Sequence, residues 1–283
     1  MLSLLVLSSI VVAAEDVVVG DVETVAEGFV FTEGPVWLPS GELIFSDIPA
    51  NTIFKADKTV FRNPSGNSNG LAVDKQGRLI ACEHGNRRVS RTEKDGTVIS
   101  LAETFEGKKL NSPNDAVVRS DGAIFFTDPP YGISVEQQEL PHQGVYMIAA
   151  DGRLKLLISD FKRPNGIGLS PDEKTLYVAD TEGNHIRAFD VAEDGTVTNG
   201  RVFCELPHPD GMAVDVRGYV WCTAEDGTRV FTPKGEWVHT VVTPQGPANC
   251  GFGDRDGKTL YITARKGLYK VRCANPGLGF GSK

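Results

Sequence analysis

The sequence predicts an all-β protein folded as a six-bladed β-propeller with a central metal-binding channel. Three observations lead to this fold class. Six segments resemble one another at intervals of 36 to 51 residues, which is the period expected of propeller blades. Glycine and proline are frequent, at 31 and 16 of 283 residues, as suits a chain with many turns. Apolar stripes with a 3.6-residue period extend over no more than about two turns, so long helices are not expected.

Each of the six segments has a polar head residue, a short apolar stretch, a turn and a strand-like run rich in Val, Ile, Tyr, Phe and Thr. The segments read EGPVWLPSGELIFSDI from Glu33, NGLAVDKQGRLIACEH from Asn69, NDAVVRSDGAIFFTDP from Asn114, NGIGLSPDEKTLYVADT from Asn165, DGMAVDVRGYVWCTAED from Asp210 and NCGFGDRDGKTLYITAR from Asn249. Asp-Gly pairs recur through the repeats and supply the positive φ that tight hairpin turns need. About four strands per repeat make one blade.

The chain before the first segment is expected to close the propeller. A strand-like stretch from about Val17 to Phe31 is predicted to complete the last blade beside C-terminal strands near Gly267–Arg272. This closure would leave no sheet edge free, and residues 15–283 would form a single domain. A twelve-strand sandwich is the alternative, but it does not predict equivalent head residues.

Residues 2–14, LSLLVLSSIVVAA, form an uncharged apolar stretch. It is too short to span a bilayer as a helix, and its length and small terminal residues match a signal peptide, here residues 1–14, with cleavage after Ala14. The preceding flank contains no Lys or Arg. We therefore expect an exported protein, periplasmic or secreted. The alternative is an uncleaved hydrophobic strand in a cytoplasmic protein.

The composition argues against nucleic acid and a stable membrane span. The net charge is −8 with a pI near 5.2, and an acidic surface repels phosphate backbones. No later apolar run is long enough to cross a membrane. The oligomeric state is left open.

The five cysteines are widely spaced and include no CxxC pair, so neither a zinc knuckle nor a dithiol redox motif is predicted. Buried structural thiols are the default expectation. Disulfides Cys204–Cys222 and Cys250–Cys273 are conceivable, but sequence alone does not decide the connectivity. The remaining cysteine is Cys82.

The six head residues are predicted to form a ring, because the first strand of each blade lines the channel of a propeller. They are Glu33, Asn69, Asn114, Asn165, Asp210 and Asn249. All carry carboxylate or amide oxygens, the ligands that calcium prefers, and none of the histidines falls at a head, which argues against zinc as the native metal. Turn preference explains Asn and Asp at such positions but not Glu33. We expect one divalent cation, calcium first, with magnesium, manganese or zinc as alternatives.

Several motifs carry a resemblance to a known family. They are EGPVW (33–37), ACEHGNRR (81–88), LNSPND (110–115), FTDPPYG (126–132), RPNGIGLSPDEKTLYVADT (163–181) and PDGMAVD (209–215). In this order and spacing, from about residue 20 to residue 272, the chain resembles the SMP-30/gluconolactonase/luciferin-regenerating-enzyme family, most closely its bacterial gluconolactonase branch. The resemblance implies a six-bladed propeller with one divalent metal in the channel and hydrolysis of sugar lactones. Relatives with this site cleave organophosphates.

The same resemblance implies roles for individual residues. Glu33, Asn165 and Asp210 would bind the metal, and Asn114 would reach the metal or the substrate. Asp210, as ligand and neighbour of a bound water, is the candidate general base. Some animal members carry an arginine two residues before the counterpart of Asn114, to hold a sugar acid. This chain has Ser112 there, so that specificity is not carried over.

Other residues are candidates for binding substrate. Asn111 lies on the same loop as Asn114 and is expected to bond a lactone hydroxyl. Asn69 and Asn249 complete the ring and are expected to hold metal-bound waters. His84 is either at the mouth of the pocket or a partly exposed turn histidine. Substrate preference is expected to reside in loops such as 132–143.

The sequence therefore predicts a metal-dependent lactonase acting on a small-molecule lactone. Two alternatives stay open: a calcium-dependent phosphotriesterase or aryl-esterase using the same site, and a non-catalytic ligand-binding propeller. The second alternative gives no reason for acidic heads around a channel. A G-x-S-x-G string at residues 66–70 resembles a nucleophile elbow, but a hairpin pattern rather than a helix follows it, which argues against a serine hydrolase.

Overall fold

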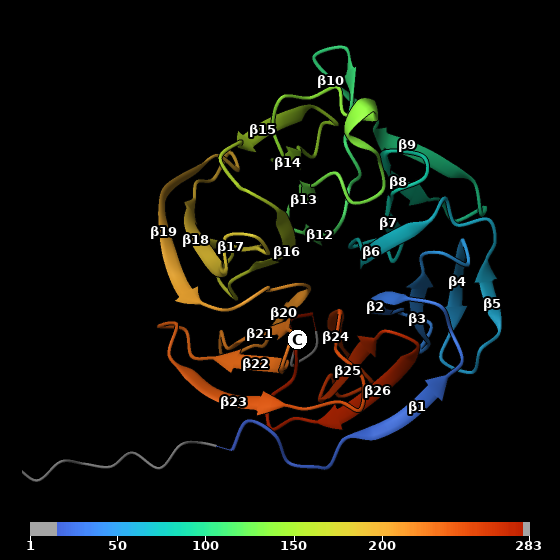
Figure 1. Ribbon diagram of the computed structural model, residues 1–283, viewed down its shortest axis with the longest axis vertical. Helices are drawn as coiled ribbons and strands as arrows, with labels where there is room; N and C mark the ends of the chain where they lie inside the picture. The colour runs from blue at the N-terminus through green and yellow to red at the C-terminus, as the bar shows by residue number, and fades with distance from the viewer. Residues whose placement is uncertain (1–15, 280–283) are drawn as a thin grey trace, which may run out of the picture.

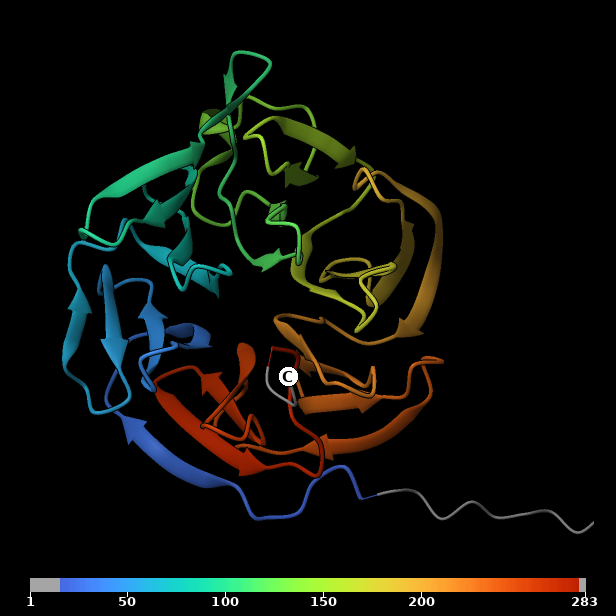
Figure 2. The same cartoon turned by 180° about the vertical axis from the view of Figure 1, so that it is seen from behind.

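The computed structural model describes residues 16–279 and consists of six four-stranded antiparallel sheets arranged around a central channel (Figures 1 and 2). This arrangement confirms the six-bladed propeller and excludes the sandwich. The predicted signal peptide, residues 1–14, lies outside the described residues. Within residues 16–279, no helix is long and apolar enough to cross a membrane.

The first three blades follow one another along the chain, each running from an inner to an outer strand. The first contains β2 (Thr32–Trp37), β3 (Leu43–Asp47), β4 (Thr52–Lys55) and β5 (Val60–Arg62). The second contains β6 (Ser68–Val73), β7 (Leu79–Glu83), β8 (Arg88–Thr92) and β9 (Val98–Ala102). The third contains β12 (Ala116–Val118), β13 (Ile124–Asp128), β14 (Gly144–Ile148) and β15 (Leu154–Ile158).

Two small elements interrupt this pattern. A hairpin of β10 (Thr104–Phe105) and β11 (Lys108–Lys109) precedes the third blade, and a 3-10 turn, η1 (Val135–Gln137), lies between β13 and β14.

The fourth blade contains β16 (Pro164–Leu169), β17 (Thr175–Asp180), β18 (His185–Val191) and β19 (Val197–Glu205). The fifth contains β20 (Met212–Val214), β21 (Val220–Ala224), β22 (Gly227–Phe231) and β23 (Trp237–Val241).

The last blade combines both ends of the described chain. It contains β24 (Asn249–Gly253), β25 (Thr259–Ala264) and β26 (Gly267–Arg272), with β1 (Glu23–Glu27) as its outer strand. The pairing of β1 with β26 is antiparallel, and the blue strand lies along the red blade in Figure 1. The predicted closure is therefore confirmed: hydrogen bonds between β1 and β26 join the N-terminal and C-terminal strands in one blade.

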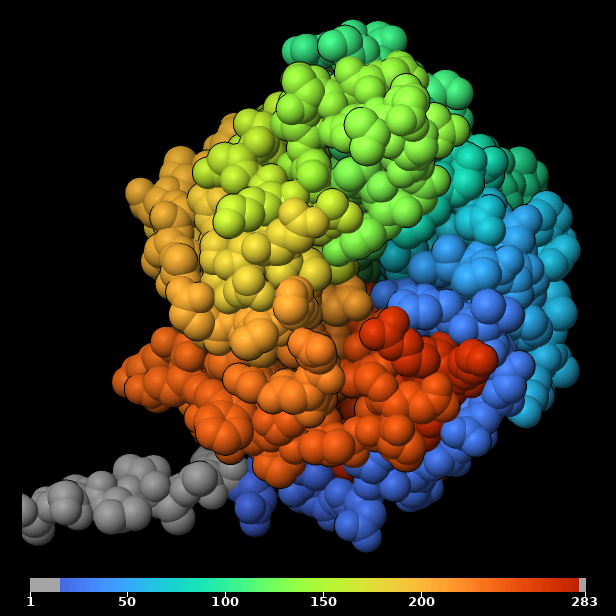
Figure 3. Space-filling view, in the orientation of Figure 1, coloured from blue at the N-terminus to red at the C-terminus, as the bar shows by residue number. Residues whose placement is uncertain are grey.

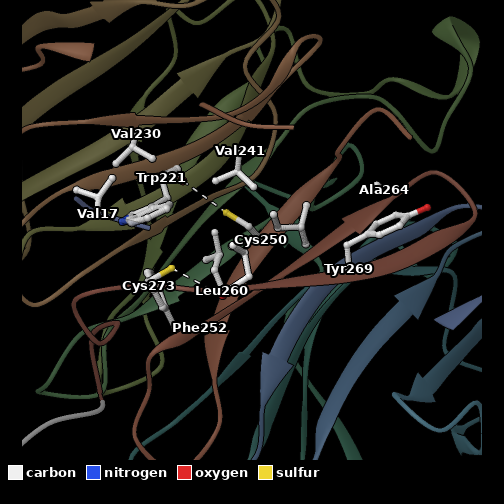
Figure 4. Close-up of a cluster of buried hydrophobic side chains, with 12 residues drawn as sticks. Val17, Trp221, Val230, Val241, Cys250, Phe252, Leu260, Ala264, Tyr269 and Cys273 are labelled. Atoms are coloured by element: carbon white, nitrogen blue, oxygen red, sulfur yellow. Dashed lines mark hydrogen bonds between the residues drawn. The ribbon is translucent and has the colours of Figure 1, made fainter. Parts of the chain in front are cut away.

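Apolar side chains fill the space between blades. Figure 4 shows one such cluster, in which Val17 from before β1 packs with Trp221 of the fifth blade and Cys250 of the last. All five cysteines are buried and free, which confirms the default expectation, and neither conceivable disulfide is present. Burial raises the pKa of the Cys204 and Cys273 thiols to about 12, so these groups stay protonated at neutral pH.

Glycines bring the inner strands of neighbouring blades close together. In four blades the residue after the head is a glycine: Gly34, Gly70, Gly166 and Gly211. The Gly70 amide donates to the Asn114 carbonyl of the next blade at 2.7 Å. A Cβ on Gly166 would lie 2.3 Å from the Asp210 carbonyl oxygen, closer than any real contact. Because glycine has no side chain, the inner strands can approach closely enough for backbone hydrogen bonds to fix the head residues relative to one another.

Candidate active site

A cavity of about 550 Å³ opens at one end of the channel, where Figure 3 shows the surface hollowed between the blades. It is lined by residues from all six blades, including most of the predicted site: Glu33, Asn69, His84, Asn114, Asn165 and Asp210. A second cavity, of about 980 Å³, lies toward the opposite end of the channel and is lined mainly by apolar side chains of the inner strands. The predicted polar residues thus gather at one end of the channel.

Glu33 lies on β2 and is 3% exposed. Burial raises its pKa well above the ordinary value, and the negative charges of Asp210 and Asp115 raise it further. The backbone amide of Gly34 donates to its Oε2 at 3.0 Å and partly offsets the increase. A buried carboxylate beside two others is costly unless protons or a cation neutralise it.

Asp210 lies just before β20, and its carboxylate opens into the cavity. Burial raises the pKa of Asp210 to about 7, whereas the Asn165 side chain and the positive charge of Arg265 lower it. A carboxylate that faces the cavity can accept a proton from a water bound there. The position of Asp210 therefore makes it a candidate general base.

Asp115 is a third buried carboxylate in this region, and it is not among the site residues predicted from the sequence. It occupies the position after the head residue, where four other blades have glycine. Burial raises its pKa to about 7, and its Oδ1 accepts a 2.9 Å hydrogen bond from the Ala116 amide. Asp115 lines the larger cavity, so it lies below the ring and adds negative charge from that side.

The amide of Asn165 is held in one orientation. The Thr181 hydroxyl donates its only proton to the Pro209 carbonyl at 2.7 Å, so toward Asn165 it can only accept. Asn165 Nδ2 donates to Thr181 Oγ1 at 3.1 Å and to the Tyr131 hydroxyl oxygen at 3.3 Å. The Asn165 side chain also lowers the pKa of the Asp210 carboxyl, as a donating amide nitrogen does, and Oδ1 of Asn165 makes no hydrogen bond within residues 16–279, so it is left for another partner.

Two further amides have uncommitted oxygens. Asn69 Nδ2 lies 3.3 Å from His84 Nε2, and its Oδ1 is buried without a hydrogen-bond partner. Burial lowers the pKa of His84 to about 4, so the ring is neutral and accepts from Asn69. The Asn114 side chain, 4% exposed, makes no hydrogen bond within residues 16–279. Buried amide oxygens without partners are uncommon and require a ligand or water.

Asn111 and Asn249 lie apart from this cavity. Asn111 is fully buried, and its Nδ2 donates to the carbonyls of Asp128 and His142 at 2.9 and 3.0 Å. Asp128 in turn accepts from the amides of Asn111 and Ser112, so these residues hold the loop that carries Asn114. Asn249 borders the larger cavity, and its side-chain amide lowers the pKa of the Glu33 and Asp115 carboxyls.

The residues present fit a hard divalent cation. Within the described chain, no three His, Cys, Asp or Glu side chains lie close enough together to hold a metal by themselves. The donors available are the carboxylates of Glu33 and Asp210 together with uncommitted oxygens of Asn69, Asn114 and Asn165. All-oxygen sets of carboxylates and amides suit calcium or magnesium. Raised carboxylate pKa values are also expected where a cation normally supplies the balancing charge.

The cavity is also lined by Tyr131, Thr181 and Arg265, for which the sequence predicts no firm role. The signal that identifies them is positional. Thr181 and Arg265 are the first residues after the second strand of their blades, as His84 is, and Tyr131 follows the second strand of the third blade by three residues. Alignment of the repeats at this position identifies these residues, as alignment at the heads identifies the ring.

Comparisons with known proteins agree with this picture. The model of the SMP-30/gluconolactonase/LRE-like region matches residues 31–266. A gluconolactonase from Zymomonas mobilis is 32% identical over 89% of this chain and 81% of that protein. Regucalcin from Oryctolagus cuniculus is 30% identical over 83% of this chain and 84% of that protein.

Solved structures are also similar. A gluconolactonase from Xanthomonas campestris superposes with a TM-score of 0.85, at 34% identity over 94% of this chain and 93% of that one. A calcium-binding protein, regucalcin, from Agrobacterium tumefaciens has a TM-score of 0.77 at 20% identity, covering 92% of this chain and 95% of that one. At that lower identity the likeness concerns the fold.

Proposed function

The chain belongs to the SMP-30/gluconolactonase/LRE-like family, and from this premise we propose that it is a metal-dependent lactonase that opens sugar lactones. The relatives named gluconolactonase support a lactone-hydrolysing enzyme. The observation that carries the metal-dependent part is the gathering of mutually repelling buried carboxylates with amide oxygens that have no partner. The all-oxygen set of carboxylates and amides supports calcium as the first candidate.

Each residue has a distinct role in the proposal. Glu33, Asp210, Asn165 and Asn114 would hold the cation, which supplies a Lewis acid for the lactone carbonyl and lowers the pKa of a water. Asp210 takes the proton from the attacking water and later returns it to the leaving ring oxygen, which becomes the hydroxyl of the opened product. Asn69 and Asn114 present polar groups to the substrate. His84 keeps Asn69 in place while remaining neutral.

The test follows proton release from glucono-1,5-lactone by protein treated with a chelator and then given calcium, magnesium, manganese or zinc. Turnover restored by one of these metals supports the proposal. A protein that binds a metal but hydrolyses only a phosphotriester or an aryl ester would place the function in the esterase class on the same site. Absence of metal binding altogether would refute the mechanism.

Thr181→Val is expected to weaken metal binding about tenfold, as is typical when the group orienting a ligand is lost. Valine cannot accept from Asn165 Nδ2, so of the two acceptors only the Tyr131 hydroxyl remains, and the amide oxygen is held less firmly for the cation. Thr181→Ser retains the hydroxyl and is the matched control. Isothermal titration with calcium measures both, and equal affinities in the two variants would contradict this role of Thr181.

Export remains part of this proposal, supported by the apolar stretch at residues 2–14. N-terminal sequencing of the protein recovered from the periplasm or medium of its host tests it. A mature N-terminus at Glu15 supports cleavage, and recovery of the uncleaved chain from the cytoplasm contradicts it.

A further inference from the structure

A second ring of residues surrounds the mouth of the active-site cavity. It consists of one residue from each blade, taken from the turn between the second and third strands. Its members are Ile48, His84, Tyr131, Thr181, Glu225 and Arg265. Five of them directly follow the second strand. The head residues form the inner ring, so a bound substrate would meet the second ring where it projects from the reacting atoms toward solvent.

The members of this ring differ in whether their polar groups are already engaged. His84 pairs with Asn69, and Tyr131 and Thr181 hold Asn165. Glu225 lies 3.4 Å from the ring nitrogen of His208. Arg265 is the exception: within residues 16–279 its guanidinium has no hydrogen bond and no carboxylate within 4.0 Å.

The backbone of Arg265 is nevertheless fixed, although the residue is exposed. Its carbonyl accepts hydrogen bonds from the Thr32 amide and hydroxyl at 2.8 and 3.2 Å, which tie its turn to the strand that carries Glu33. Its guanidinium lies over the Phe31 ring, 5.4 Å from the centroid, and its charge lowers the pKa of Asp210. The guanidinium of Arg265 therefore lies against the cavity wall, within electrostatic reach of the candidate base Asp210.

Another arginine, Arg163, shows the contrast. Arg163 also lies over an aromatic ring, that of Tyr131, at 5.0 Å. Its guanidinium, however, pairs with Glu182 at 2.8 Å, so its charge is balanced. A stacked guanidinium presents a rigid fork of donors that matches a carboxylate or a phosphate. Of these two arginines, only Arg265 has that fork free.

We propose that Arg265 binds an anionic substituent of the substrate, a carboxylate or a phosphate carried by the lactone away from its reacting carbonyl. The enzyme would then prefer anionic over neutral sugar lactones. This inference rests on the proposed lactonase function and adds the substrate class to it. It also moves the expected determinant of specificity, because the lining of the cavity includes Tyr131 but no residue of loop 132–143.

The test compares Arg265→Gln with Lys266→Gln. Lys266 is the next residue of the same turn, is exposed, and does not line the cavity, so its substitution removes an equal charge from the same region. The neutral probes are glucono-1,5-lactone and glucono-1,4-lactone. The anionic probes are 6-phosphoglucono-1,5-lactone and glucaro-1,4-lactone, which distinguish a phosphate from a carboxylate.

We expect wild-type kcat/KM to be higher for at least one anionic probe than for its neutral counterpart. Arg265→Gln should lower this anionic-to-neutral ratio about 10- to 30-fold, as expected for loss of a hydrogen bond to a charged group. Lys266→Gln should change the ratio less than about threefold. No anionic preference in the wild type, or the same change in both variants, would overturn the proposal.

A binding measurement separates this proposal from the lactonase function. Titration with 6-phosphogluconate, glucarate and gluconate reports anion binding without turnover. If no lactone is hydrolysed but an anionic acid binds more tightly than gluconate in an Arg265-dependent manner, the lactonase proposal fails and the anion site stands. If lactones are hydrolysed and the acids bind equally to wild type and Arg265→Gln, the anion site fails and the lactonase stands.

Discussion

Asp210→Asn is expected to lower kcat/KM for glucono-1,5-lactone by about a thousandfold or more. The amide cannot accept the proton from water, and loss of a general base alone typically costs 10²- to 10⁴-fold. The substitution also removes one negative charge from the carboxylates that would hold the cation. Because asparagine has nearly the same shape, the inner strand should keep its position. Steady-state assays at saturating metal measure the effect.

Asp215→Asn in the same blade is the matched control. Asp215 is buried, and its Oδ1 accepts from the amides of Arg217 and Tyr219, but it does not line the active-site cavity. Asparagine keeps an acceptor for these amides, so activity should stay within about threefold of wild type. A tenfold loss or less in Asp210→Asn, with metal binding retained, would show that another group activates the water.

The propeller could be predicted from the sequence because its signals are local and repeated. Each blade has its own turn residues and its own apolar strands, so six imperfect copies together give a clear period. The pairing of β1 with β26 is distant in sequence, yet it followed from the rule that a propeller leaves no free edge. The ring of head residues could be predicted for the same reason, because the symmetry of the repeats places equivalent positions around one axis.

Asp115 was missed because it lies next to a head and resembles part of the same motif. Its significance appears only when the repeats are aligned one residue further, where Gly70 and Gly166 occupy the equivalent position and allow close approach of the next blade. The third blade has a carboxylate there, and burial raises its pKa. The substitution of glycine by aspartate breaks a packing pattern, which is a signal of a functional position.

Asn111 shows where local reasoning could not succeed. Its place in the LNSPND motif, three residues before Asn114, suggested a contact with substrate. In the structure its amide nitrogen bonds two carbonyls, one of which is that of His142, contributed by the long connection between β13 and β14. No local pattern specifies how that connection folds back, so the partner of Asn111 depends on tertiary contacts.

The stability of the metal-free protein is expected to fall as the pH rises from about 5 to 8. Burial raises the pKa of Glu33, Asp115 and Asp210 in the folded protein, so the folded state holds protons that the unfolded chain releases near pH 4. Stability from this source is fully present below the unfolded pKa and is lost as the pH rises through the folded value, about 7 for the two aspartates. Thermal unfolding in a chelator at several pH values measures the slope.

Added metal should offset the loss of stability at higher pH, because the cation binds the deprotonated carboxylates and competes with the protons. At pH 8 and about 100 to 1,000 times its dissociation constant, calcium should raise Tm by roughly 5 to 12 °C, and by much less at pH 5. Asp128, whose pKa burial also raises to about 7, lies outside the cavity and should leave a small residual slope that metal does not remove. Glu33→Gln should flatten the metal-free slope and abolish most of the calcium effect. A metal-free Tm that rises between pH 5 and 8 would mean that the carboxylates are balanced within the protein. A Tm that none of the four metals changes would mean that the channel holds no cation.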